Sequence, residues 1–170
     1  MDAETLRAIQ APLKQHYRDN PAQALVPARA EALIDQEHLT CRLSGPRHEY
    51  SGLHPAAGGP AGQACSADML LESLVACAGV TLAAVATSMG VVLRHGRVVA
   101  DSSWDARGTL AIDRAVPIGL GPISLCFELD TDADAATLAR LLKSTERYCV
   151  IFQTLAAAPT CTARAVKHPQ

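Results

Sequence analysis

Apolar residues repeat along the chain at spacings typical of helices in some stretches and of strands in others. The first such stretch covers residues 3–19, and its apolar positions lie three or four residues apart at Leu6, Ile9, Leu13 and Tyr17. Pro12 is expected to kink this helix, because proline lacks the backbone N–H that helices need. We therefore expect residues 1–26 to form a docking helix, followed by one main domain at residues 27–170.

The next apolar pattern alternates every second residue, which is typical of strands. Residues 28–34 and 38–43 both alternate in this way, and the short polar stretch between them predicts a hairpin. A loop rich in glycine and proline follows at residues 52–62. Loops of this length in compact domains often border functional sites.

The most distinctive stretch is a predicted helix at residues 66–90. Ser66 is the expected N-cap, Asp68 lies in the first turn and Gly90 is the expected C-terminal cap. Its apolar positions cover most of the helix circumference: Leu70, Leu71, Leu74, Cys77, Val80, Thr81, Ala84 and Val85. Such a helix is typical of a protein core. Because Glu72 and many small residues interrupt the stretch, we interpret it as a core helix rather than a membrane span.

The remaining patterns predict strands and two more helical segments. Strands are expected at residues 91–104, 106–112, 120–129 and 159–166. Gly108 is expected to mark a bulge or bend. Residues 131–134 are expected to open a helix with an apolar face at Leu138, Leu141 and Leu142, and a further helical turn is expected at residues 149–155. Strands and helices are segregated in this order, which favours an α+β fold with an antiparallel sheet.

Composition narrows the class of function. The formal net charge is −2, and the lysines and arginines are scattered, so we expect neither nucleic acid nor a membrane as a partner. The first 20 residues lack the basic-then-apolar pattern of a signal peptide, so a cytoplasmic location is expected. The six cysteines stand alone without a CxxC motif, so reduced thiols are expected, and no metal or other cofactor is predicted.

Two of these cysteines lie in segments that could support thiol chemistry. Cys77 lies in the middle of the long helix, too far from its N-terminus to gain from the helix dipole. A reactive Cys77 therefore needs a cation from elsewhere in the fold. Cys149 lies at a junction of two helical segments, where free backbone N–H groups could favour a thiolate. On the residues alone, a packed, unreactive thiol is the commoner role for either one.

Two motifs resemble a known family. Residues 66–81 read Ser-Ala-Asp-Met-Leu-Leu-Glu-Ser-Leu-Val-Ala-Cys-Ala-Gly-Val-Thr, and residues 149–155 read Cys-Val-Ile-Phe-Gln-Thr-Leu. They resemble the two signature regions of the OsmC/Ohr family: a helix that begins with proline and glutamate and carries a cysteine, then a Cys-Pro-x-Ser-x-Thr-Leu segment. Here Ala67 and Val150 replace the two prolines, and Phe152 replaces the serine. The resemblance covers roughly residues 27–167.

The resemblance implies a fold, an activity and partners. The implied fold is an intertwined homodimer in which antiparallel sheets wrap long central helices. The implied activity is reduction of organic hydroperoxides: Cys77 attacks the peroxide and becomes a sulfenic acid, which condenses with Cys149 to a disulfide. An external dithiol reductant then restores the pair.

The resemblance also implies an arginine beside the reactive thiolate and an acid that holds this arginine. Arg29 is our candidate and Arg47 the alternative, although either could be a solvated charge. Asp68 stands at the position of the acid, Glu72 is a second candidate, and either could serve only the helix itself. Cys65, just before the long helix, is a third redox partner or a surface thiol, while Cys41, Cys126 and Cys161 are expected in the core.

These observations leave three hypotheses about function. The first is a thiol-dependent peroxidase that uses Cys77 and Cys149. The second is a non-catalytic dimer of the same fold that binds a small apolar or thiol-containing ligand. A third reading, in which the cysteines only pack, predicts that removing Cys77 changes stability and leaves redox behaviour unaltered.

Overall fold

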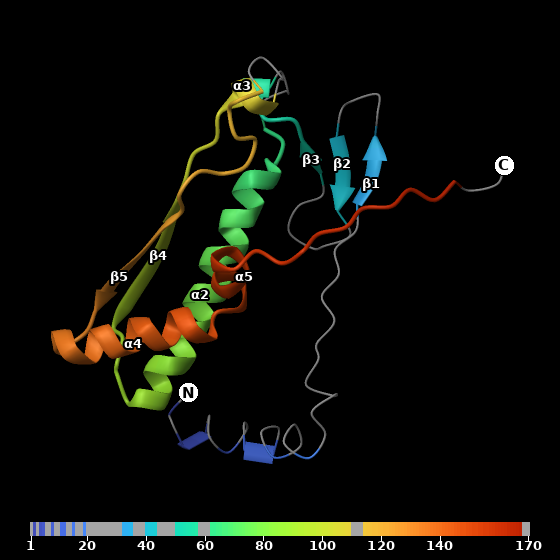
Figure 1. The fold of residues 1–170 in the computed structure, drawn as a ribbon. Helices are drawn as coiled ribbons and strands as arrows, with labels where there is room; N and C mark the ends of the chain where they lie inside the picture. Colours follow the sequence, from blue (N-terminus) through green and yellow to red (C-terminus); the bar gives the residue numbers. More distant parts are fainter. Residues whose placement is uncertain are drawn as a thin grey trace.

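A long helix, α2 (Ser66–Met89), forms the axis of the protein, and β4 (His95–Asp101), α4 (Ala135–Tyr148) and α5 (Val150–Ala156) pack along it (Figure 1). The computed structural model describes residues 32–35, 40–43, 50–57, 62–109 and 114–167, together with residues 2, 4, 5, 8, 11, 12, 15 and 19. The described residues from 4 to 19 have helical backbone, as expected for that stretch. The docking role and the boundary of this segment stay predictions.

Two separate antiparallel sheets confirm the α+β class. The first has the order β1–β2–β3, with β1 (Ala32–Asp35), β2 (Thr40–Leu43) and β3 (Ser51–Gly52). Its β1–β2 pairing confirms the expected hairpin. The second sheet consists of β4 (His95–Asp101) and β5 (Ser124–Asp130), paired along their whole length. Both strands are shorter than the patterns that predicted them.

Helix α2 begins and ends close to the predicted bounds, with one correction. The N-cap is Cys65 rather than Ser66, and it makes no side-chain capping hydrogen bond. At the other end Gly90 adopts a left-handed conformation with φ of 69°, which glycine tolerates without strain. Its N–H donates to the carbonyl of Thr87 over 3.1 Å.

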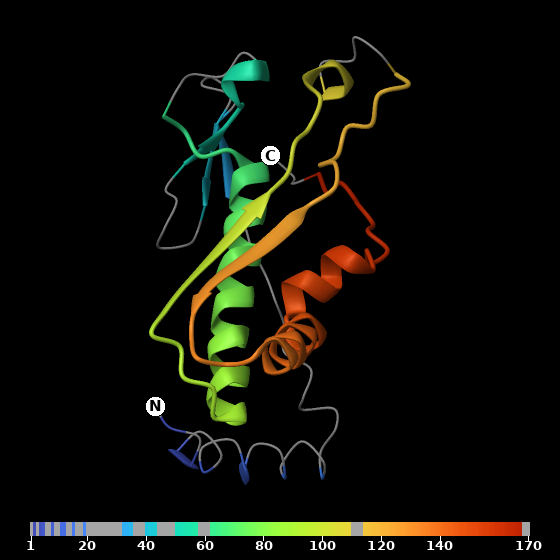
Figure 2. The same cartoon turned by 90° about the vertical axis from the view of Figure 1, so that its left-hand side faces the viewer.

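The hydrophobic core lies between α2, β4–β5 and α4 (Ala135–Tyr148) (Figure 2). The buried residues of α2 recur every four positions and form one stripe: Leu74, Ala78, Leu82 and Ala86. Leu141 of α4 is fully buried against this stripe, and Phe127 and Leu129 of β5 pack beside it. Asp134 caps α4 by accepting a hydrogen bond of 2.7 Å from the N–H of Thr137, which confirms the expected helix start.

The opposite face of α2 is exposed within the single chain. It carries small and apolar residues at positions three or four apart: Ser73, Ala76, Val80 and Ala83. Val80 is 74% exposed. The prediction of a helix buried nearly all round is therefore met on one face only in the single chain.

Two expected strands are wrong. Residues 106–109 form the short helix α3 (Ala106–Thr109), because the N–H of Gly108 bonds to the carbonyl of Asp105 and closes a turn. Any side chain on Gly108 would come within 2.9 Å of the carbonyl oxygens of Val116 and Pro117, so the close approach requires glycine. Residues 159–166 pair with no described strand and are exposed, so the alternating pattern there lacks the partner that a strand needs.

The expected burial of two cysteines is also wrong. Cys126 is exposed because the residues of β5 alternate, with Leu125, Phe127 and Leu129 facing inward. Cys161 is exposed on the segment that forms no strand. The side chain of Cys41 lies outside the described part of the structure.

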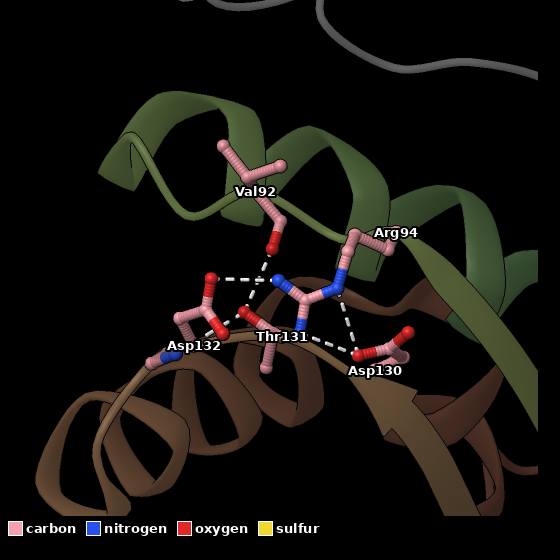
Figure 3. A network of polar contacts seen from close by, with 6 residues as sticks. Val92, Arg94, Asp130, Thr131 and Asp132 are labelled. Carbon is pink, nitrogen blue, oxygen red and sulfur yellow. Dashed lines mark hydrogen bonds and ion pairs between the residues drawn. The ribbon is translucent and has the colours of Figure 1, made fainter.

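An ion-pair network closes the end of the fold where α2 stops (Figure 3). Arg94, just before β4, bonds to the carboxylates of Asp130 and Asp132, both over 2.6 Å. The hydroxyl of Thr131 donates to the carbonyl of Val92 over 2.7 Å. These contacts join the segment after α2 to the turn between β5 and α4.

Candidate functional site

The structure brings Cys77 and Cys149 together. Cys77 lies on α2, and Cys149 lies between α4 and α5 (Val150–Ala156), which packs against α2. The two side chains are close enough for the Cys149 thiol to donate a hydrogen bond to the Cys77 sulfur. Cys149 is 1% exposed, and Cys77 is partly exposed. The partly exposed thiol is therefore the one a small substrate can reach from solvent.

The environment of Cys77 favours its thiolate. Burial raises the pKa of the Cys77 thiol, but hydrogen bonds to its sulfur outweigh burial and lower the pKa overall. The donors are the backbone N–H of Ile151, the Cys149 thiol, the backbone N–H of Val150 and the hydroxyl of Thr81. Ile151 and Val150 open α5, so their N–H groups have no partner within their own helix.

The pKa of the Cys149 thiol shifts in the opposite direction. Burial raises the pKa of the Cys149 thiol, and its hydrogen bond to the Cys77 sulfur holds it protonated. The N–H of Phe152 donates to its sulfur over 3.4 Å, so Cys149 also caps α5. The free N–H groups that the sequence suggested for Cys149 at this junction are shared: those of Phe152 and Ile151 lower the pKa of Cys149 without offsetting its burial, and those of Ile151 and Val150 lower the pKa of Cys77.

The predicted acids do not lie beside this pair, and the predicted arginines are not tested. Arg29 and Arg47 lie outside the described part of the chain. Asp68 is exposed in the first turn of α2. It precedes Cys77 by nine residues, about 13 Å along the axis and on the other side of the helix. Glu72 is exposed as well.

Sequence reasoning missed the donors that α5 and α2 supply. Thr81 follows Cys77 by four residues, and residues with this spacing lie on one face of a helix, so the sequence held this signal. The N–H groups of Val150 and Ile151 carried no such signal, because their approach to Cys77 depends on how α5 packs on α2. Among the described residues, no cation is part of the environment that shifts the pKa of Cys77.

A mainly apolar cavity of about 610 Å³ lies between α2, β5, α4 and α5. Leu70 and Leu74 line it from α2, and Leu74 precedes Cys77 by one helical turn on the same side. Phe152 lines it from α5, while the backbone of the same residue bonds to Cys149. The cavity walls thus continue into the two segments that hold the cysteine pair.

A second cavity of about 380 Å³ lies at the start of α2 and contains Cys65. His54 and Trp104 also line it, with their rings 5.3 Å apart in an edge-to-face arrangement. Cys65 is partly buried here rather than on the open surface. It takes no part in the hydrogen bonds around Cys77.

Comparison with protein families decides the classification. Residues 59–164, more than half of the chain, match the model of the OsmC-like protein family. The chain belongs to the OsmC-like family. Both cysteines of the pair lie within the matched residues.

Solved structures of low sequence identity share the fold of this OsmC-like chain. An OsmC-like protein from Mycoplasma pneumoniae aligns with a TM-score of 0.64 at 13% identity, covering 78% of this chain and 89% of that one. A hypothetical protein from Aquifex aeolicus VF5 aligns with a TM-score of 0.59 at 15% identity, covering 79% and 90%. An OsmC-like protein of unknown function from Vibrio cholerae aligns with a TM-score of 0.54 at 10% identity, covering 75% and 94%.

No curated protein sequence matches the chain at a significant level. By length and composition alone, α2 is apolar enough to cross a membrane. In this OsmC-like fold the same helix packs against β4, α4 and α5, so it is the core helix that the sequence predicted.

Proposed function

We propose that this OsmC-like protein is a thiol-dependent peroxidase that reduces organic hydroperoxides through Cys77 and Cys149. The observation that carries the proposal is that the pKa values of the two thiols shift in opposite directions. Hydrogen bonds from the start of α5 lower the pKa of Cys77, whereas burial raises the pKa of Cys149. A peroxidase of this kind needs one thiolate to attack and one neighbouring thiol to resolve.

The reaction divides into three balanced steps. The Cys77 thiolate attacks the outer oxygen of the hydroperoxide, the O–O bond breaks, and the alcohol leaves after taking up a proton. Cys77 is then a sulfenic acid. The sulfur of Cys149 attacks the Cys77 sulfur, a disulfide forms and water leaves. An external dithiol returns two electrons and two protons by thiol–disulfide exchange.

Mass spectrometry of the oxidised protein tests this proposal. After one equivalent of cumene hydroperoxide, we expect one disulfide per chain between Cys77 and Cys149, and none in Cys77→Ser. Cys65→Ser is the matched control and should still form the disulfide, because Cys65 lies outside the hydrogen bonds around Cys77. A wild-type protein that keeps both thiols free after this treatment rules out the peroxidase function.

The second candidate is a dimer of the same fold that binds a small apolar or thiol-containing ligand without turnover. Two observations favour it: the mainly apolar cavity beside the pair, and the lack of a cation among the described residues that set the pKa of Cys77. A ligand retained through purification, in a protein whose Cys77 does not react with peroxide, would favour this candidate over the peroxidase.

We also propose that the protein is a cytoplasmic homodimer in which the exposed face of α2 meets a second copy. Small residues on that face, such as Ala76 and Ala83, allow close approach of another element, and Val80 would become buried. We expect Val80→Glu to give a monomer in sedimentation analysis. Val92→Glu is the matched control, because Val92 is 72% exposed but lies beyond the end of α2. A wild-type monomer at micromolar concentration would contradict the dimer.

A further inference from the structure

One carboxylate interrupts the apolar lining of the large cavity. Glu146 lines it from α4, one helical turn after Leu142. The other lining residues are apolar or glycine, and those that face the cavity from neighbouring elements include Leu74, Phe127, Phe152 and Leu155. Glu146 is therefore the one ionisable side chain among the cavity's lining residues.

The position of Glu146 is fixed by the junction between α4 and α5. Its backbone carbonyl accepts a hydrogen bond of 2.8 Å from the side chain of Gln153, so the two helices are tied together at this residue. Within the described ranges, no cation pairs with its carboxylate. Arg147, the next residue, lies over the ring of Tyr148 at 5.8 Å instead.

A carboxylate in this position discriminates between ligands by charge. Glu146 is exposed, so water partly screens its carboxylate, but a second negative charge placed a few ångström away inside the cavity is still repelled. A neutral ligand of the same shape meets no such repulsion and still buries its apolar surface. Discrimination of this kind works by penalising the wrong ligand rather than by adding contacts to the right one.

We propose that Glu146 is a specificity-determining residue that makes the cavity accept neutral organic hydroperoxides and reject those with a carboxylate. The proposal rests on the proposed peroxidase function, because the cavity lies beside the cysteine pair. Leu74, one turn before Cys77, and Phe152, whose N–H bonds to the Cys149 sulfur, both line the cavity, so the proposal places the ring of a hydroperoxide bound at Cys77 there, near Glu146.

A matched pair of substrates tests this role. One is cumene hydroperoxide carrying a carboxylate at the para position, and the other is the methyl ester of the same compound, which is neutral. With the wild-type protein we expect kcat/KM for the ester to exceed that for the acid about fivefold, mainly through KM. In Glu146→Gln we expect the kcat/KM for the acid to rise to within about twofold of the kcat/KM for the ester.

The matched control is Glu128→Gln. Glu128 lies on β5 outside the cavity and pairs with Arg97 over 3.3 Å. This variant removes the same charge from the protein and should keep the wild-type ratio of ester to acid. An ester-to-acid ratio that is equal in the wild-type protein and in Glu146→Gln overturns the proposal.

A binding measurement separates this inference from the peroxidase function. The alcohols that correspond to the two substrates are titrated into Cys77→Ser by calorimetry, so no chemistry occurs. If the ester alcohol binds more tightly than the acid alcohol, and adding Glu146→Gln removes this difference in affinity, the role of Glu146 is supported even if no peroxide is consumed. Equal binding of the two alcohols overturns it even if peroxide turnover is fast.

Discussion

The two halves of α2 differ in what packs against them. Its C-terminal half lies in the closed core, where Leu82 and Ala86 pack on Leu141, and the network around Arg94 joins the segments just beyond it. Its N-terminal half borders two cavities and carries Leu70, which is 40% exposed. Cys77 lies near the middle of the helix, so one element links a packed region that stabilises the fold to an open region that can receive a ligand.

The largest expected effect comes from a substitution that removes the reactive thiol and leaves the packing of the core unchanged. Cys77→Ser should lower the rate of peroxide reduction by a factor on the order of a thousand or more, because the hydroxyl is a far weaker nucleophile than a thiolate. The loss of cumene hydroperoxide, measured with excess dithiol, checks this. Thermal unfolding should change little, and equal loss of activity in Cys126→Ser, on the exposed face of β5, would contradict the assignment.

The second prediction concerns the packed core at the C-terminal half of α2. Leu141→Ala should destabilise the protein by about 3 kcal/mol, because the side chain is 0% exposed and its removal leaves a cavity in the core. Denaturant unfolding measures this difference. Leu53→Ala, at a 40% exposed position, is the control and should cost much less. A small effect at Leu141 would show that the core in this half is looser than its burial indicates.

A third prediction concerns the junction between the halves. Cys149→Ala removes a donor to the Cys77 sulfur, so the pKa of Cys77 should rise. Since the thiolate is the reactive form, the profile of Cys77 alkylation by iodoacetamide should move to higher pH. At any pH below the pKa the rate should fall. Cys65→Ala should leave the profile in place, and a shift to lower pH in Cys149→Ala would contradict the hydrogen bond.

The smallest expected effect concerns the network beyond α2. Arg94→Ala removes the ion pairs to Asp130 and Asp132, but all three side chains are exposed to solvent, and such pairs contribute little. The melting temperature should fall by less than in Leu141→Ala, and the difference from wild type should shrink as salt rises. A large effect that salt does not alter would mean that the network does more than join two turns.

Local patterns in the sequence determined much of the fold. The length and end of α2 followed from its apolar run and from Gly90, the start of α4 followed from Asp134, and the first hairpin followed from alternation. Each of these signals depends on residues that are close in sequence, so the sequence alone is enough to detect it. The two motifs around Cys77 and Cys149 likewise pointed to the OsmC-like family, which the match over residues 59–164 confirms.

Only the tertiary structure decided how the two cysteines differ. The pKa of each depends on donors from distant segments: Val150 and Ile151 of α5 reach Cys77, whose own helix lies some 70 positions earlier in the chain. The place of Glu146 in an apolar cavity is a property of four packed elements and had no local signal. The strand expected at residues 159–166 was wrong for the same reason, because a strand needs a paired neighbour that its own sequence cannot identify.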